Sequence, residues 1–211
     1  LMADALRAAA LSPEFSRAAR IHLIETSPVL RETQRQALAG RAVNWHDGFA
    51  DIPAGPVLVI ANEFFDALPV RPLPLTEEGW HERLVAVHEN GCRFILSASG
   101  TPAAALLTPD VRDNAPPGAI AEIQPAALTI VADIAARIAN EGGAALIIDY
   151  GHAKSAVGDT LQAVRRHEPH DVLSDPGEAD LTVHVDFDAL ARAAGPDVRY
   201  FGPVDQGVFL Q

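Results

Sequence analysis

Short apolar runs alternate with segments of helical pattern along most of this 211-residue chain, and this alternation constrains the fold more than any other feature. The longest runs, such as GPVLVIA and AALIID, have the size of strands and fall well short of the roughly 18 residues that a membrane-spanning helix needs. Strands separated by helices form βαβ units with parallel pairing and right-handed crossovers. We therefore expect an α/β fold, with a mostly parallel sheet that carries helices on both faces.

The expected elements follow from periodicity and from their end residues. Ser27 is a plausible N-cap, Pro28 suits a first helical turn, and Gly40 suits a helix end. Helices are expected over 1–10, 27–40, 124–140 and 186–195, and strands over 20–25, 41–46, 56–62, 144–151, 198–202 and 207–211. The stretch 153–180 is expected to be mostly loop.

The alternation is interrupted between residues 70 and 118. Here three strand-like runs, VRPLPL, WHERLVAVHE and CRFILSAS, are separated by turn sequences, and Asn90-Gly91 favours a β-hairpin. A proline-rich loop follows. We expect a core made of residues 1–69 and 119–211, with an antiparallel insertion and loop over 70–118.

Composition and charge limit the possible partners. The formal net charge of −12 excludes a broad electrostatic surface for nucleic acid, and it suits either a cationic partner or simple solubility. Cys92 is the only cysteine, which excludes an intrachain disulfide and a cysteine-rich zinc site. We predict no metal, no membrane insertion and a reducing, cytoplasmic compartment.

Polar residues stand where four of the expected strands end, at Glu25, Asp47, Asn62 and Asp149. In parallel α/β sheets, ligands bind outside the carboxyl ends of the strands. An acid at the position of Glu25 can accept hydrogen bonds from ribose hydroxyls, or it can be a solvated loop residue. Asp47 can accept from an adenine amino group, or it can be a turn residue in the sequence HDG.

The segment NEFFDALP, residues 62–69, places acids and aromatic residues directly after an apolar strand. With Asn62 as N-cap, Glu63 and Asp66 would share one face of a short helix, and Phe65 would anchor it with its neighbour Phe64. Paired carboxylates can hold a guanidinium or ammonium group. The alternative is that these acids only favour the helix dipole.

The segment DYGH at 149–152 follows a later strand, so His152 is either a substrate contact or a structural surface residue. His184 lies within the alternating run LTVHVDF and is predicted to be a face residue rather than a ligand. Metalloprotease, serine-hydrolase and P-loop motifs are absent from the sequence, so hydrolase and kinase functions have no support.

Several segments occur together in an order that resembles one family: LIETSPVLRETQRQAL, VLVIANEFFDALPVRP, LIIDYGH, DPGEADLTVHVDF and GPVDQGVFL. They resemble the MidA family of S-adenosylmethionine-dependent methyltransferases. Mitochondrial members of that family are arginine methyltransferases that act on a subunit of respiratory complex I. The resemblance implies a class I, Rossmann-like methyltransferase core, S-adenosylmethionine as cofactor, and a protein arginine as acceptor, with a respiratory complex subunit as one possible partner. In a eukaryote, the implied compartment is the mitochondrial matrix.

The resemblance also implies roles for particular residues. Glu25 and Asp47 would bind the cofactor, on its ribose and adenine sides. Asn62, Glu63 and Asp66 would be catalytic, and the substrate would contact Phe65, Asp149 and His152. Family members carry a Gly-rich cofactor loop before the position of Leu1 and continue past GVFLQ, so the chain is expected to be trimmed at both ends.

Two other functions are compatible with the fold class. One is a non-catalytic assembly or scaffold protein, which would have no need to keep the acids of NEFFD. The other is a nicotinamide-dependent oxidoreductase, against which the antiparallel insertion and the family resemblance both argue.

Overall fold

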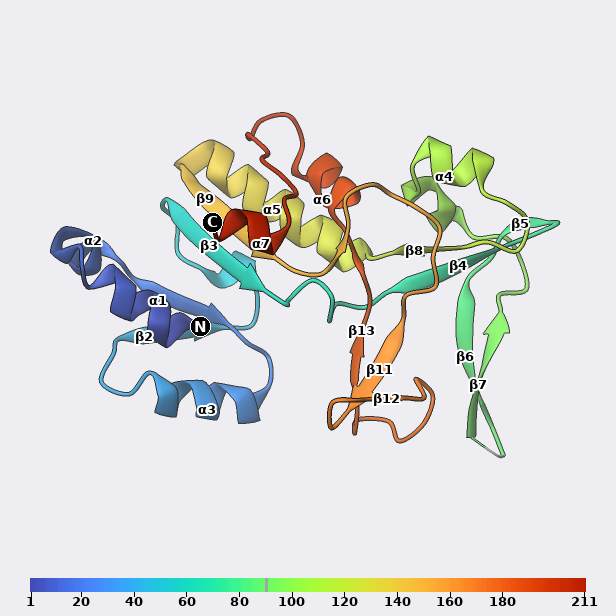
Figure 1. Ribbon diagram of the computed structural model, residues 1–211, viewed down its shortest axis with the longest axis horizontal. Coiled ribbons are helices and arrows are strands. Elements are labelled where there is room, and N and C mark those ends of the chain that lie inside the picture. Colours follow the sequence, from blue (N-terminus) through green and yellow to red (C-terminus); the bar gives the residue numbers. More distant parts are fainter. Residues whose placement is uncertain (90) are drawn as a thin grey trace. The chain divides into compact units, whose positions relative to one another are not determined.

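A computed structural model describes residues 1–89 and 91–211 of the chain (Figure 1). The predicted turn at Asn90-Gly91 therefore lies partly outside the described residues. The chain divides into two compact units, Leu1–Gly55 and Pro56–Gln211.

Residues 1–55 contain a βαβ unit preceded by two helices. The elements are α1 (Met2–Ala9), α2 (Pro13–Ala18), β1 (Ile21–Ile24), α3 (Pro28–Ala37), β2 (Val43–His46) and a 3₁₀ turn, η1 (Phe49–Asp51). Strands β1 and β2 pair in parallel. Helix α3 begins where predicted, because the Ser27 hydroxyl accepts a hydrogen bond from the backbone N–H of Leu30 at 3.3 Å.

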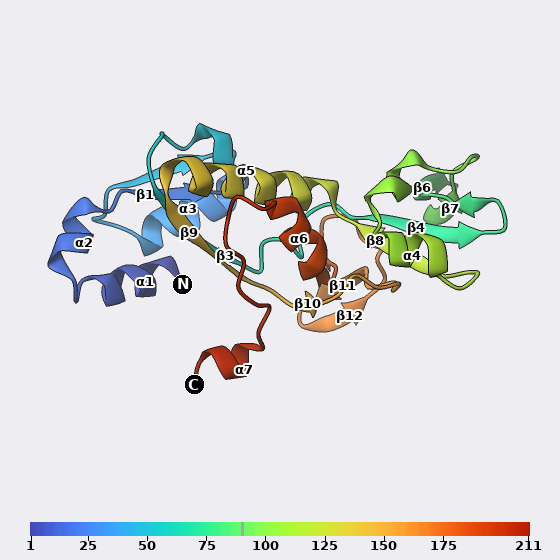
Figure 2. The same ribbon diagram turned by 90° about the horizontal axis from the view of Figure 1, so that it is seen from above.

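The second unit is organised around two parallel strand pairs. Strand β3 (Val57–Asn62) pairs with β9 (Gly143–Ile148), and β10 (Gly151–His152) pairs with β14 (Val185–Asp186). Helix α5 (Pro125–Glu141) packs against β3 and β9, and α6 (Phe187–Ala194) packs against α5 (Figure 2). The register of the first pair places Asn62 opposite Ile148, so the two strands end side by side.

A hydrophobic cluster holds this parallel part of the unit together. Phe65, Ala127 and Val185 are fully buried in it, and Val131 and Leu190 are nearly so. These residues come from α5, α6, β14 and the segment after β3. Phe65 thus packs the segment after β3 into the core, and its predicted contact with the substrate stays a prediction.

The antiparallel part follows β3 along the chain. Strand β4 (Arg71–Thr76) lies between β5 (Gly79–Trp80) and β8 (Ile120–Ile123), and β6 (Arg83–His88) forms a hairpin with β7 (Gly91–Leu96). A 3₁₀ turn, η2 (Pro102–Leu106), and α4 (Pro109–Asn114) cover a second cluster that contains Leu73 and Trp80. Strand β4 lies inside the predicted insertion, whereas its partner β8 lies just after it. The pairing therefore crosses the predicted boundary, and the limits 70–118 stay a prediction.

Two stretches differ from the sequence-based expectation. Within 153–180, which was expected to be mostly loop, β11 (Gln162–Arg165) pairs with β12 (Glu168–His170) and, further along the chain, with β13 (Asp180–Thr182). The strands expected over 198–202 and 207–211 are wrong: the first stretch is irregular, and the second contains α7 (Gln206–Phe209). A strand needs a partner for its backbone groups, and within the described residues neither stretch has one.

The α/β class, with parallel strand pairs and helices packed on them, is thus confirmed. The finer arrangement of a Rossmann-like sheet stays a prediction.

The close approach of β10 and β14 gives a test of this packing. A Cβ atom on Gly151 would lie 2.0 Å from the carbonyl oxygen of Val185, so the strands must separate to accommodate it. We expect Gly151→Ala to lower the free energy of unfolding by about 2 kcal/mol or more, since overpacking typically costs about 1–3 kcal/mol. Urea titration would measure the loss.

Gly207→Ala is the matched control, because a Cβ there meets nothing within 4 Å. It should leave stability unchanged or slightly raised. Equal stability of the two variants would contradict the close strand packing.

Candidate functional site

The segment NEFFDALP forms a turn rather than the predicted short helix. Asn62 is the last residue of β3, and the Glu63 N–H donates to the carbonyl of Ile148 at 2.9 Å. Glu63 then takes a left-handed conformation with φ of 46°, which ends the strand sharply. Glu63 is exposed whereas Asp66 is buried, so the expectation that both acids share one helix face is wrong.

The carboxylate of Asp149 explains why a turn forms instead of a helix. Its Oδ2 accepts hydrogen bonds from the backbone N–H groups of Phe65 at 3.0 Å and Asp66 at 3.2 Å. Its Oδ1 accepts from the N–H of Tyr150 at 2.9 Å. These donors come from the segments that follow β3 and β9, so one side chain ties together the ends of two paired strands. Burial, and then the charge of Asp66, raise the pKa of the Asp149 carboxyl.

Asp66 lies beneath this turn with only 4% of its surface exposed. One carboxylate oxygen, Oδ2, accepts a short hydrogen bond from the hydroxyl of Tyr150, while Oδ1 is buried with no hydrogen-bond partner among the described residues. Burial, followed by the hydrogen bond to Asp66, raises the pKa of Tyr150 to about 12. Tyr150 lies inside the DYGH motif, but no role was predicted for it from the sequence.

Gln124 is a second residue that the sequence analysis missed. Its side-chain amide donates to the carbonyls of Phe65 at 2.7 Å and Leu68 at 3.2 Å. Gln124 immediately precedes Pro125, the first residue of α5, so the start of that helix is joined to the turn. The only indication of this role in the sequence is that a polar residue stands directly before a proline that starts a helix.

Glu25 follows β1 and is held in a fixed orientation within residues 1–55. Its Oε1 accepts from the N–H of Ser27 at 2.9 Å, and its Oε2 accepts from the side-chain amide of Gln34 at 3.2 Å. A carboxylate oxygen can accept more than one hydrogen bond. Glu25 therefore keeps acceptor capacity for a ligand hydroxyl while its position is fixed by α3.

Asp47 lies at the end of β2 in the same unit, where it is 82% exposed and forms an ion pair with Arg31. Arg31 also donates to the backbone carbonyls of Glu25 and His46. Nearby, the indole N–H of Trp45 donates to Gln34 at 2.8 Å. The structure thus groups the two predicted cofactor residues around Arg31 and α3.

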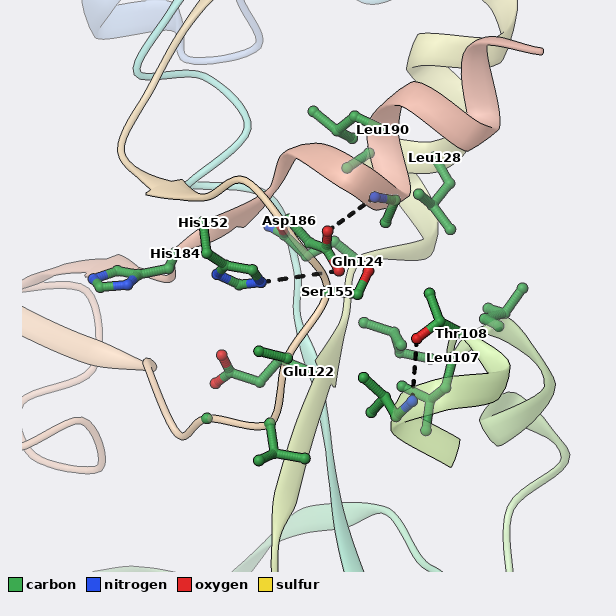
Figure 3. Close-up of a pocket in the computed structure, with 18 of the residues that line it drawn as sticks. Leu107, Thr108, Glu122, Gln124, Leu128, His152, Ser155, His184, Asp186 and Leu190 are labelled. Carbon is green, nitrogen blue, oxygen red and sulfur yellow. Dashed lines mark hydrogen bonds and ion pairs between the residues drawn. The ribbon is translucent and has the colours of Figure 1, made fainter. Parts of the chain in front are cut away.

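A pocket of about 240 Å³ lies in the second unit (Figure 3). His152 lines it, with its Nε2 3.9 Å from the Oδ2 of Asp186. His184, Gln124 and Asp186 also line it, although the sequence analysis had set His184 aside and had not singled out the other two. The pocket lies between α4, α5, β8, β10 and α6.

The structure therefore places Asn62, Glu63, Phe65 and Asp66 at one turn, which the Asp149 side chain holds from the end of β9. His152 follows Asp149 along the chain and lines the pocket. The roles predicted for all of these residues stay predictions. None of the helices that the structure describes has the length and apolar character required to cross a membrane.

Comparison with known proteins identifies a family for nearly the whole chain. A family described as "Putative S-adenosyl-L-methionine-dependent methyltransferase" matches residues 1–204.

Relatives of known name were found in animals. Protein arginine methyltransferase NDUFAF7, mitochondrial, from Mus musculus is 39% identical and covers 90% of this chain and 48% of its own length. The Drosophila melanogaster homolog is 36% identical and covers 90% of this chain and 50% of its own length. The chain thus spans about half the length of the curated relatives it matches.

A similar fold occurs in a crystal structure from Burkholderia thailandensis that contains S-adenosyl-homocysteine. It is 29% identical, with a TM-score of 0.74, over 92% of this chain and 52% of that chain. A native structure of an uncharacterized protein from the same organism gives a TM-score of 0.67 at 28% identity, over 83% of this chain and 50% of that chain.

The buried contact between Tyr150 and Asp66 can be tested by substitution. Tyr150→Phe removes the hydroxyl and leaves the buried carboxylate without this donor. We expect the free energy of unfolding at neutral pH to fall by about 1–3 kcal/mol, the usual cost of leaving a buried acceptor unsatisfied. Tyr200→Phe is the control, because Tyr200 is the only other tyrosine and is half-exposed.

The same pair of variants should differ in the size of their pH dependence, because burial also raises the pKa of Tyr200, but less than that of Tyr150. The folded-state pKa of about 12 lies above the ordinary value of 10, so Tyr150 contributes stability that is fully present below pH 10. This contribution is lost as pH rises from 10 towards 12, because the unfolded tyrosine ionises first. Urea unfolding on both sides of pH 10 should show a smaller decline in Tyr150→Phe than in the unmodified protein. An equal decline would contradict the shift at Tyr150.

Proposed function

Because this chain belongs to the family of S-adenosyl-L-methionine-dependent methyltransferases, we propose that it takes part in methyl transfer from that cofactor to an arginine side chain of a protein. The observation that carries the proposal is the match over residues 1–204. Relatives named protein arginine methyltransferases and a related structure with bound S-adenosyl-homocysteine support it. A subunit of a respiratory complex is the acceptor that we propose, by analogy with the mitochondrial relatives.

The proposed fold is a class I, Rossmann-like core formed by residues 1–69 and 119–211. The parallel pairs β1–β2 and β3–β9, with α5 packed on the second pair, support this arrangement. Residues 70–118 form the proposed insertion, and its antiparallel pairings β4–β5 and β6–β7 are consistent with that.

Glu25 and Asp47 are proposed as the cofactor-binding residues. The side chain of Glu25 is oriented by two donors and retains acceptor capacity, which suits the two hydroxyls of a ribose. Asp47 is exposed and its charge is balanced by Arg31, so it can accept from a neutral amino group such as that of adenine. When bound, S-adenosyl-L-methionine supplies an electrophilic methyl group carried on a sulfonium.

The acceptor side of the proposed site is the turn after β3. Asn62 and Glu63 are exposed there and can orient a guanidinium group, and the Glu63 carboxylate stabilises its positive charge. Asp66 is proposed to act beneath them, because its buried carboxylate holds the hydroxyl of Tyr150. Asp149 fixes the turn through the backbone, so the groups above it are held in place before the acceptor arrives.

Phe65 is proposed to support the acceptor site through packing, and His152 to contact the substrate from the pocket. A charge of −12 favours approach of a cationic acceptor protein. The mitochondrial location in the names of the animal relatives is theirs; for this chain we propose the matrix if its source is eukaryotic and the cytoplasm otherwise.

Calorimetric titration of the full-length protein with S-adenosyl-L-methionine and with NAD tests the proposed cofactor. We expect binding of the first ligand alone, and we expect Glu25→Gln to weaken it by about 1–3 kcal/mol, or roughly fivefold to 150-fold. Glu32→Gln, on the exposed surface of α3, should bind normally. Binding of NAD, or of neither ligand, would refute the proposed function, whereas normal binding by Glu25→Gln would remove only the role of Glu25.

Single-turnover methyl transfer tests the acceptor side. We expect Glu63→Gln to slow transfer by roughly 10²-fold while cofactor affinity and melting temperature stay unchanged, because Glu63 is exposed and acts by charge. Asp66→Asn should slow transfer comparably and also lower the melting temperature, since Asp66 is buried. Normal transfer in Glu63→Gln would show that the exposed acid has no part in holding the acceptor.

A further inference from the structure

The pocket beside His152 has two kinds of wall (Figure 3). Leu107, Leu128 and Leu190 line one part with aliphatic side chains, and they come from the segment before α4, from α5 and from α6. The other part is polar and includes Asp186 and Glu122. An occupant must therefore combine an aliphatic portion with a polar or charged end.

The volume limits the size of the occupant. At about 240 Å³, the pocket is smaller than the roughly 300–1,000 Å³ usual for small-molecule sites. It suits one long amino-acid side chain rather than a nucleotide.

The charge of the lining favours a cation. The lining carries two carboxylates, Asp186 and Glu122, and one guanidinium, that of Arg192, together with the two imidazoles already described. The Nε of Arg192 lies 3.5 Å from Asp188, which is outside the lining, so part of its charge is already balanced. The Glu122 carboxylate already accepts from the backbone N–H groups of Thr160 and Leu161 at 3.0 and 3.1 Å. Asp186 is thus the carboxylate with capacity left for a ligand.

The two oxygens of Asp186 have different surroundings. Oδ1 accepts from the backbone N–H of Ala189 at 2.9 Å and so caps the start of α6. Oδ2 has no hydrogen-bond donor among the described residues, since the Nε2 of His152 is 3.9 Å away and beyond direct bonding distance. The cap holds the carboxylate in position, and Figure 3 shows His152 as the contact of the other oxygen, at ion-pair rather than hydrogen-bond distance.

From these features we infer that the pocket binds a second arginine side chain of the acceptor protein, different from the one that Asn62 and Glu63 are proposed to orient. The guanidinium donates to Oδ2 of Asp186, and the aliphatic stem packs on Leu107, Leu128 and Leu190. Arginine fits this combination because its charged end donates hydrogen bonds to carboxylates and its stem is apolar. The inference rests on the proposed function for the identity of the acceptor, but the binding it describes does not require bound cofactor.

The test is a titration with N-acetyl-L-arginine methylamide, followed in the methyl spectra of the protein by nuclear magnetic resonance. We expect saturable shifts of the methyl groups of Leu128 and Leu190. The citrulline analogue, which has the same shape without the charge, should produce no saturable shift at the same concentrations. Absence of arginine binding, or equal binding of citrulline, would overturn the inference.

Two matched variants separate charge from structure. Asp186→Asn removes the charge but keeps a good helix cap, because Asn and Asp serve equally well at that position. We expect it to weaken arginine binding about tenfold, the scale of one charged hydrogen bond. Asp133→Asn makes the same change on the exposed surface of α5, outside the pocket lining, and should stay within about twofold of the unmodified protein.

Melting temperatures of both variants should match that of the unmodified protein. Unchanged arginine binding in Asp186→Asn, or an equal loss in Asp133→Asn, would overturn the inference. Titration of the same samples with S-adenosyl-L-methionine keeps the two proposals apart. If arginine binds through Asp186 but the cofactor does not bind, the proposed function fails and the pocket stands.

Discussion

The second unit depends on one interaction, the acceptance of three backbone N–H groups by the carboxylate of Asp149. Two of the donors belong to the segment after β3, and the third belongs to the segment after β9. Without this acceptor, the N–H groups of Phe65 and Asp66 would be left in a region where Phe65 is fully buried, at a cost of about 1–3 kcal/mol for each unsatisfied group. The same carboxylate therefore closes the parallel pair and sets the path of the chain that carries Asn62 and Glu63.

A second carboxylate makes this arrangement electrostatically demanding. Asp66 lies close enough to Asp149 to raise its pKa, and it is itself buried with one oxygen unpartnered among the described residues. Buried ionised groups are costly unless they are hydrogen-bonded. The hydroxyl of Tyr150 offsets part of that cost, and Gln124 offsets the cost of two nearby carbonyls. Costly buried groups of this kind are frequently retained where a site must be rigid before its substrate binds.

The alternation of apolar runs was sufficient to predict the helices at Ser27 and Pro125, the parallel strands and the polar residues at their ends, since these depend on local periodicity and capping. It was insufficient for the turn after β3, because that turn is formed by an acceptor 84 residues away from Phe65 along the chain. The contribution of Tyr150 was missed for the same reason: its partner is equally distant.

The hairpin β11–β12 was missed because its residues lack a clear apolar alternation. The C-terminal strands were predicted from apolar content, although pairing decides whether a strand forms. The family resemblance supplied roles for Glu25 and Asp47 that local sequence left open.

The hairpin β6–β7 is closed at its base by two hydrogen bonds between Glu82 and Ser97, and Arg71 and Thr101 hold the Glu82 carboxylate from outside the hairpin. The free energy of closing a loop rises only slowly with its length, by about 0.6 kcal/mol for each doubling. A change in the length of the hairpin beyond this clamp would therefore alter the free energy of folding only slightly, while the contacts of Glu82 would still hold its base.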